Sequence, residues 1–100
     1  MIIYNVTVRV EHDVKEDWVA WMKSTHIPDV MNTGKFVSHR LCKLLGHDET
    51  DGVTYAVQYL CQNIAVYNDY IREHSEVLKK EHVERYGEKC LAFRSLLEVI

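Results

Sequence analysis

The chain has 100 residues, 47% of them hydrophobic, and a formal net charge of −3, which is the size and composition of one globular domain. Its 12 basic and 15 acidic residues are interspersed, and the lack of a basic stripe argues against binding to nucleic acid or to an anionic membrane surface. No stretch approaches the roughly 18 apolar residues of a membrane-spanning helix. We therefore expect a single domain over residues 1–100, with neither nucleic acid nor membrane among its partners.

The cysteines and the N-terminal segment indicate in which cellular compartment the protein is expected. Cys42, Cys61 and Cys90 are odd in number and have no CxxC or His-rich spacing. This argues against a disulfide framework or a zinc knuckle and predicts a cytoplasmic protein. The N-terminal segment alternates in hydrophobicity and lacks a basic n-region, so it reads as a strand and not as a signal peptide.

The first two elements are a strand and a helix. Alternation with period 2 predicts a strand over about residues 2–10. Its apolar face holds Tyr4, Val6, Val8 and Val10. A helix is expected over about 14–25, with Asp13 as N-cap and Glu16 completing a capping box. Its inward stripe consists of Val14, Trp18, Trp21, Met22 and Thr25.

The only proline interrupts the helical pattern. Pro28 disfavours helix at the residue before it, so we expect a kink there and a short helical piece over 28–33. Gly34 would end that piece. A second strand follows at about 36–45, and its mixed pattern suggests a strand covered on both sides. The segment 46–52, rich in Asp and Gly, predicts the hairpin to the next strand.

The second half repeats the order of strand, helix and strand. A strand at about 53–61 has an apolar row of Val53, Tyr55, Val57 and Tyr59. A helix over about 64–86 is expected to be capped by Asn63 and ended by Gly87. Its inward stripe is Ile64, Tyr67, Ile71, His74 and Leu78. A last strand at about 90–99 has a row of Leu91, Phe93, Leu97 and Val99.

This order predicts an α+β fold of the ferredoxin-like type, β-α-β-β-α-β, with a four-stranded antiparallel sheet and two helices on one face. The helices should cover the three apolar rows. The other face would carry a polar cluster of Asn5, Thr7, Arg9, Gln58, Arg94 and Glu98. Apolar residues lie between these, so two such faces could dock in a two-fold dimer. Within the cluster, either Glu98 neutralises an arginine as a structural contact, or the arginines bind a carboxylate ligand.

Two histidines are candidate catalytic residues. His26 lies at the kink, where it is either a general base or ligand at a pocket mouth, or a cap that stabilises the kink. His74 lies on the inward stripe, where it is either a second functional group or a satisfied core residue. His82 follows eight residues after His74, too far round the helix to form a conventional pair with it. No third ligand is at hand, so no metal site is predicted.

Four aromatic residues are candidate ligand-binding residues, although simple core packing would also account for them. They are Trp18, Trp21, Tyr55 and Tyr59. The sequence contains no GxGxxG, no P-loop and no nucleophile elbow. We therefore expect no cofactor.

Four stretches, MIIYNVTV, WMKSTHIPDVMNTGKF, VTYAVQY and AFRSLLEVI, cover both ends and the middle of the chain. Through them the chain resembles a family of short bacterial proteins of unknown function within the dimeric α+β-barrel superfamily. The resemblance implies a ferredoxin-like protomer and a sheet-to-sheet homodimer, and no activity. With the residues above, it favours a homodimer that binds or senses a small hydrophobic molecule. The alternatives are a cofactor-independent enzyme, monooxygenase- or isomerase-like, acting on a hydrophobic or aromatic substrate, and a structural or interaction module.

Overall fold

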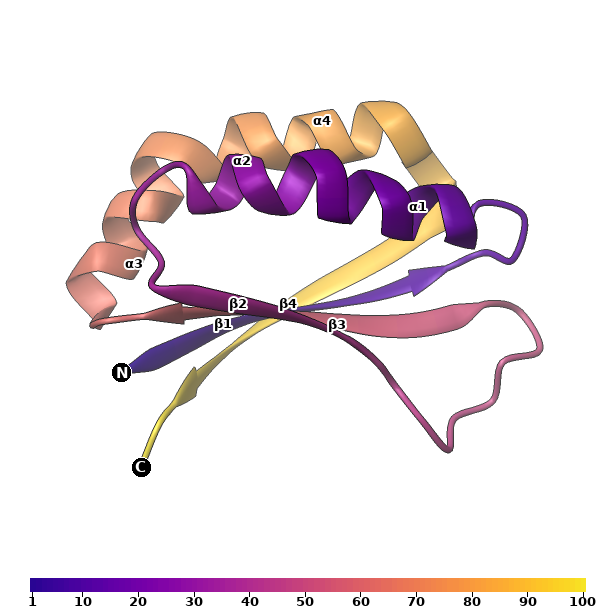
Figure 1. Cartoon of the computed structure of the whole chain (residues 1–100), viewed down its shortest axis with the longest axis horizontal. Helices are drawn as coiled ribbons and strands as arrows, with labels where there is room; N and C mark the ends of the chain where they lie inside the picture. The colour runs from indigo at the N-terminus through magenta and orange to yellow at the C-terminus, as the bar shows by residue number, and fades with distance from the viewer.

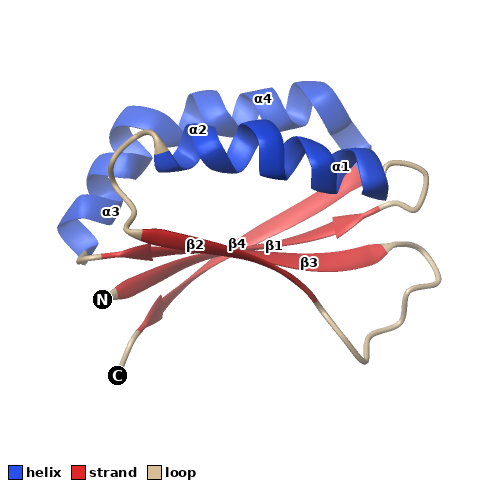
Figure 2. Cartoon of the chain, in the orientation of Figure 1, coloured by secondary structure: helices blue, strands red, loops and turns tan.

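The computed structural model describes residues 1–100 and has the element order β-α-β-β-α-β (Figure 1). One antiparallel sheet holds the strands in the order β2-β3-β1-β4. They are β1 (Ile2–Val10), β2 (Ser38–Lys43), β3 (Val53–Cys61) and β4 (Cys90–Glu98). All helices lie on one face of the sheet and leave the other face open (Figure 2). The predicted ferredoxin-like α+β fold is confirmed.

Each of the two helices is interrupted by one π turn. In the first, α1 (Lys15–Trp21) passes through the π turn Met22–His26 into α2 (Ile27–Met31). In the second, α3 (Ile64–Tyr70) passes through Ile71–Ser75 into α4 (Glu76–Tyr86). A single turn of 3₁₀ helix, Gly87–Lys89, leads into β4. None of these helices is both long enough and apolar enough to cross a membrane.

The hydrophobic core lies between the helices and the sheet, as the rows on β1 and β3 predicted. Tyr4, Val8 and Val10 of β1 are buried, as are Val57 and Tyr59 of β3. From the helices, Trp18, Met22, Val30, Tyr70 and Leu78 belong to the same cluster. The predicted helix-facing rows of β1 and β3 are therefore confirmed.

The prediction of which side chains of β4 face the helices was wrong, because the alternation is shifted by one residue. Val6 pairs with Arg94, and Thr7 pairs with Phe93, so Arg94 shares the helix-covered face with Val6. Leu91 and Phe93 lie on the open face, where they are 68% and 63% exposed. Both faces of this strand are partly apolar, so the period-2 pattern could not indicate which face the helices cover.

Two predictions for the first helix were also wrong. Asp13 is not its N-cap, because Val14 holds that position without a side-chain hydrogen bond. The Asp13 carboxylate instead accepts a hydrogen bond of 2.9 Å from Lys89. The chain does not leave the helix at Pro28 either. The Ile27 N–H donates to the Met22 carbonyl, so a π turn takes the place of the expected kink.

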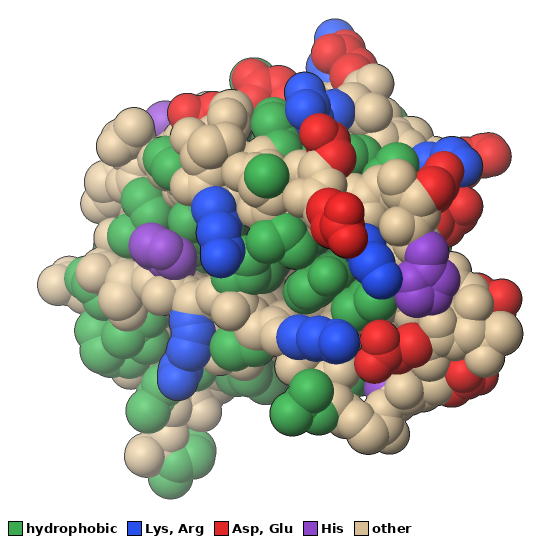
Figure 3. Space-filling view, turned by 45° about the vertical axis from the view of Figure 1, so that its right-hand side comes forward, with side chains coloured by type: hydrophobic (Ala, Val, Ile, Leu, Met, Phe, Trp, Pro, Cys, Tyr) green, Lys and Arg blue, Asp and Glu red, His purple; other side chains and the backbone are tan.

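Strand β2 is shorter than expected and is an exposed edge strand, not a strand covered on both sides. The second helix follows its prediction more closely. The Asn63 side chain accepts the N–H of Val66 at 3.0 Å, and the helix ends at Gly87 with a φ of 53°. Outside the core, charges of both signs mix, and acidic side chains lie among the basic ones on the face shown in Figure 3.

Loss of the Asn63 cap should cost stability, because it frees a backbone N–H at the start of the helix. We expect Asn63→Ala to lower the free energy of unfolding by about 1 kcal/mol. Asn68→Ala, an exposed change in the same helix, should be neutral or slightly stabilising because alanine favours helix. Urea denaturation followed by circular dichroism measures both variants, and equal losses would contradict the capping role.

Candidate functional site

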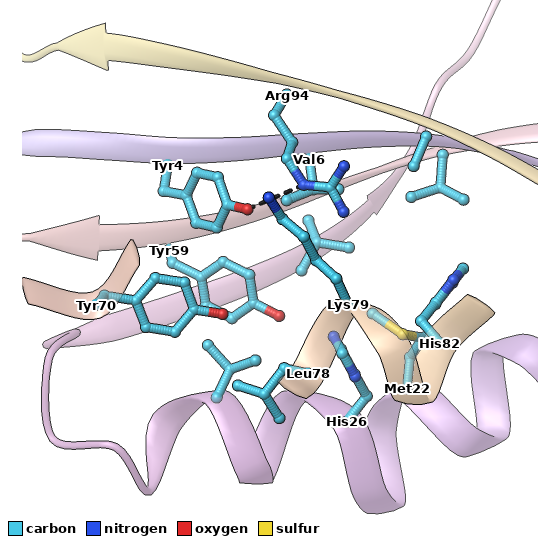
Figure 4. Close-up of a pocket in the computed structure, with 14 residues that line it drawn as sticks. Tyr4, Val6, Met22, His26, Tyr59, Tyr70, Leu78, Lys79, His82 and Arg94 are labelled. Carbon is cyan, nitrogen blue, oxygen red and sulfur yellow. Dashed lines mark hydrogen bonds between the residues drawn. The ribbon is translucent and has the colours of Figure 1, made fainter. Parts of the chain in front are cut away.

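A small cavity of about 40 Å³ lies between the helices and the sheet. His26 and Met22 reach it from the first helix, and Leu78, Lys79 and His82 reach it from α4 (Figure 4). The sheet contributes Tyr4, Val6, Val8, Val57, Tyr59, Ala92 and Arg94, and Val30 and Tyr70 complete the lining. Ten of the fourteen lining residues are hydrophobic and none is Asp or Glu. The polar groups of the cavity are therefore histidines, tyrosine hydroxyls and two cations.

The π turn Met22–His26 explains why His26 faces this cavity. Trp18, Met22 and Val30 are buried. Together with His26 they form a row in which each residue follows the previous one by four positions. In a regular α-helix, steps of four residues drift by about 40° each. The wider π turn offsets this drift and keeps the row over the sheet. Single π turns of this kind recur at functional sites.

The Nδ1 atom of His26 is buried and has no hydrogen-bond partner. The ring lies against Trp21, with 5.0 Å between centroids. Burial first, and then the proximity of His82 and Arg94, lowers the pKa of His26 to about 4. His26 is therefore a neutral imidazole at neutral pH, and its ring lines the cavity.

His82 is the second histidine of the cavity, with its ring 6.0 Å from that of His26. Trp18 donates its indole N–H to His82 Nε2 at 2.9 Å. Since Nε2 accepts, the neutral ring carries its proton on Nδ1. Burial, and then the charge of Arg94, lowers the pKa of His82 as well. Trp18 thereby fixes the tautomer of a cavity histidine.

The structure does not bring His74 to the cavity. His74 Nε2 lies 3.7 Å from a carboxylate oxygen of Glu73, outside the core. The second π turn adds a residue to the turn after Tyr70, so Ser75 is buried there with 4% exposure. The same shift turns His82 inward. An uninterrupted helical pattern could not reveal this exchange, and only the i, i+4 spacing of His82 from Leu78 hinted at it.

Of the four aromatic residues predicted to bind a ligand, only one lines the cavity. Tyr59 lines the cavity, but Trp18, Trp21 and Tyr55 do not. Trp18 is fully buried and packs on Tyr55, with 4.9 Å between ring centroids. Trp21 covers His26 and His82 from the outer side. Sequence reasoning missed Tyr4 and Tyr70 as lining residues, although the inward row of the first strand contained Tyr4.

The side chains of the predicted polar cluster lie on two different faces of the sheet. Asn5 donates to Thr7 at 3.0 Å and accepts from Gln58 at 3.3 Å on the open face. Arg9 is on that face too, paired with Asp51 at 3.1 Å. Arg94 and Glu98 were placed there wrongly, because the register of β4 puts both on the helix side. Glu98 makes no ion pair with either arginine. No group of three or more His, Cys, Asp or Glu side chains gathers to hold a metal ion.

A family model described as a domain of unknown function, DUF4286, matches residues 1–100. No curated protein matches the chain. Among solved structures, a dimeric ferredoxin-like protein from an uncultured marine organism is similar with a TM-score of 0.75. It has 13% identity, and the match covers 99% of this chain and 94% of that one.

Two other solved structures carry descriptions that name a family or an activity. A protein from Bacillus halodurans C-125 that is described as a member of the ethyl tert-butyl ether (EthD) family is similar with a TM-score of 0.70 and 12% identity over 100% of both chains. SnoaB from Streptomyces nogalater, a cofactor-independent oxygenase studied as a mutant, is similar with a TM-score of 0.60. It has 10% identity over 98% of this chain and 92% of that one. At these identities the likeness shows the fold alone.

The lowered pKa of His26 predicts a specific loss of stability in acid. Between pH 6.5 and about 4 the unfolded chain holds a proton on His26 that the folded chain does not. The free energy of unfolding should therefore fall as the pH falls through this range, by about 3 kcal/mol at most from this residue. His26→Leu should remove this part of the decline. His74→Leu, which removes a histidine outside the cavity, should keep it. Urea denaturation from pH 4 to 7 measures the difference, and equal slopes for wild type and His26→Leu would contradict the assignment.

Proposed function

The chain belongs to the DUF4286 family, whose function is unknown. From the site itself we propose that the protein is a homodimer that binds a small molecule between its helices and its sheet. The observation that carries the proposal is that His26, whose buried Nδ1 has no hydrogen-bond partner, lines a cavity. A buried polar atom without a partner is costly unless something completes its hydrogen bonding. A ligand atom in the cavity would do so.

The composition of the cavity supports the same proposal. Its walls are mostly apolar, and a few polar groups converge from three strands and both helices, which is the usual make-up of a ligand site. Its volume of about 40 Å³ exceeds what one water needs but is far below that of a site for a drug-sized ligand. The ligand therefore inserts one small group, and the rest of it lies at the mouth.

The open face of the sheet supports assembly into a dimer. Leu91, Phe93 and Leu97 are exposed there in a row, beside the hydrogen-bonded pair Asn5 and Gln58. An apolar surface of this kind on a sheet is more stable when covered, and a second copy covers it with a self-complementary surface. The similar protein from the marine organism is described as dimeric.

A second candidate function is catalysis without a cofactor, with His26 as the general base. The observation that favours it is that His26 is neutral at neutral pH and that its ring lines the cavity. SnoaB is described as a cofactor-independent oxygenase. A purely structural module would give the buried Nδ1 of His26 no role. We also propose a cytoplasmic protein, since all three cysteines are free, and a bacterial one, as the resemblance to short bacterial proteins implies.

Filling the cavity should abolish ligand binding. Ala92 lines the cavity from β4, and Ala92→Leu would occupy the space with three further carbons. Native mass spectrometry of protein from the producing cell should find a bound small molecule in wild type and none in Ala92→Leu. Ala65→Leu, on the exposed side of α3, should keep the molecule. Equal loads in all three proteins, or none in wild type, would contradict the proposal.

A charge in the centre of the open face should separate the dimer. Phe93→Glu places a carboxylate where two sheets would meet, and burying it unpaired is costly. We expect a dimer for wild type and a monomer for Phe93→Glu in size-exclusion chromatography with light scattering at micromolar concentration. Val83→Glu, an exposed change on α4, should remain dimeric. A monomeric wild type would overturn the assembly.

A further inference from the structure

Two cations of the cavity have no acidic partner. Arg94 from β4 and Lys79 from α4 both line it, and neither lies within ion-pair distance of a carboxylate, although most other basic side chains of the helices and hairpins do. Figure 4 shows Arg94 hydrogen-bonded to the Tyr4 hydroxyl and Lys79 extending from α4 toward the same part of the cavity. Two positive side chains therefore meet at the cavity, the exposed Arg94 and the half-buried Lys79, in a chain whose net charge is −3.

Arg94 is held in a position to bind a ligand. Its Nε–H donates to the Tyr4 hydroxyl at 3.1 Å, which orients the guanidinium and leaves its terminal nitrogens without a protein partner. The planar fork of a guanidinium matches the two oxygens of a carboxylate. Lys79 adds a second charge. Burial first, and then the nearby Arg94, lowers its pKa, and the charge of Glu76 on the same helix opposes this only in part. A bound anion would relieve the repulsion between the two cations.

We propose that the cavity selects a small organic acid, whose carboxylate is bound by Arg94 and Lys79, and that binding is coupled to proton uptake by the histidine pair His26 and His82. This inference rests on the proposed function, because it names the ligand class of the same site. It identifies Arg94, which the sequence pattern placed on the opposite face, as the residue that determines specificity.

Size and lining favour a carboxylate over a phosphate. A cavity of about 40 Å³ admits a planar group of three heavy atoms more readily than a tetrahedral, strongly hydrated dianion. Beyond the two cations, the lining offers few donors, mainly the tyrosine hydroxyls of Tyr4, Tyr59 and Tyr70. The apolar walls would leave the remaining oxygens of a phosphate unsatisfied.

The coupling to protons follows from the charges around His26. The charged and titratable groups that surround the cavity are Arg94 on β4, Lys79 and His82 on α4, Tyr4 on β1, Tyr59 on β3 and Tyr70 on α3. None of these lining groups supplies a negative charge at neutral pH. The nearest carboxylate that acts on them is that of Glu76, which acts on Lys79 from outside the lining. Arg94 lowers the pKa of both histidines, so a carboxylate bound to Arg94 counteracts this effect and raises both pKa values. Binding should then draw a proton onto one imidazole.

Isothermal titration calorimetry near pH 6 tests the proposal with benzoate, its neutral isostere benzamide, and inorganic phosphate. Two cationic buffers of different protonation enthalpy reveal proton uptake without adding a competing anion. Wild type should bind benzoate with proton uptake and bind benzamide and phosphate at least tenfold more weakly, roughly the effect of one charge-assisted interaction. Arg94→Gln should weaken benzoate binding by roughly tenfold or more, and Lys79→Gln by less. Lys80→Gln, which removes an exposed charge paired with Glu84, should have no effect.

Each other outcome overturns the inference. Benzoate and benzamide bound equally, and both lost in Ala92→Leu, would show a ligand site without anion selectivity, leaving the proposed function standing. Tighter binding of phosphate would exclude a carboxylate site, and binding of none of the probes would exclude anion recognition altogether. Unchanged binding in Arg94→Gln would remove its role. Should Arg94→Gln unfold, Arg94→Lys decides, because it keeps the charge and loses the fork, and it should bind benzoate more weakly than wild type does.

Discussion

The extra residue in each π turn decides which helical side chains face the sheet, and the cavity depends on that register. In the first helix the π turn keeps His26 in line with Trp18 and Met22. In the second it buries Ser75 and brings His82 inward. Two regular α-helices of the same sequence would place other side chains over the sheet. The π turns therefore place two histidines, His26 and His82, above Tyr4 and Arg94 of the sheet.

The polar side chains on the sheet side of the cavity determine which ligands it can bind. Arg94 is anchored by the Tyr4 hydroxyl, and no carboxylate neutralises it or Lys79. The positive field acts on the two imidazoles and adds to their burial in keeping them neutral. A neutral base beside unpaired cations is suited to bind an anionic group and then to take up a proton. Binding and acid–base chemistry would thus share one electrostatic cause.

Much of the fold follows from local patterns, whereas the site depends on register. The alternation in β1 and β3, the cap at Asn63 and the stop at Gly87 each reflect a strong local preference, and the structure has them all. The orientation of β4 depends on long-range pairing, since both of its faces are partly apolar, and the sequence pattern misplaced Arg94. The exchange of His74 for His82 depends on one π turn, which the periodicity does not predict, although the spacing of His82 from Leu78 is consistent with an inward position.

The register of the two histidines can be measured directly by NMR, with titration of all six histidine side chains followed through their ring carbon and nitrogen shifts. The structure predicts that His26 has its pKa lowered to about 4. It also predicts that His82 is a neutral ring with its proton on Nδ1, held by the indole of Trp18. If His26 titrates at the ordinary value near 6.5, or if the His82 proton is found on Nε2, the imidazoles are not packed over the sheet as described here and the site has no basis.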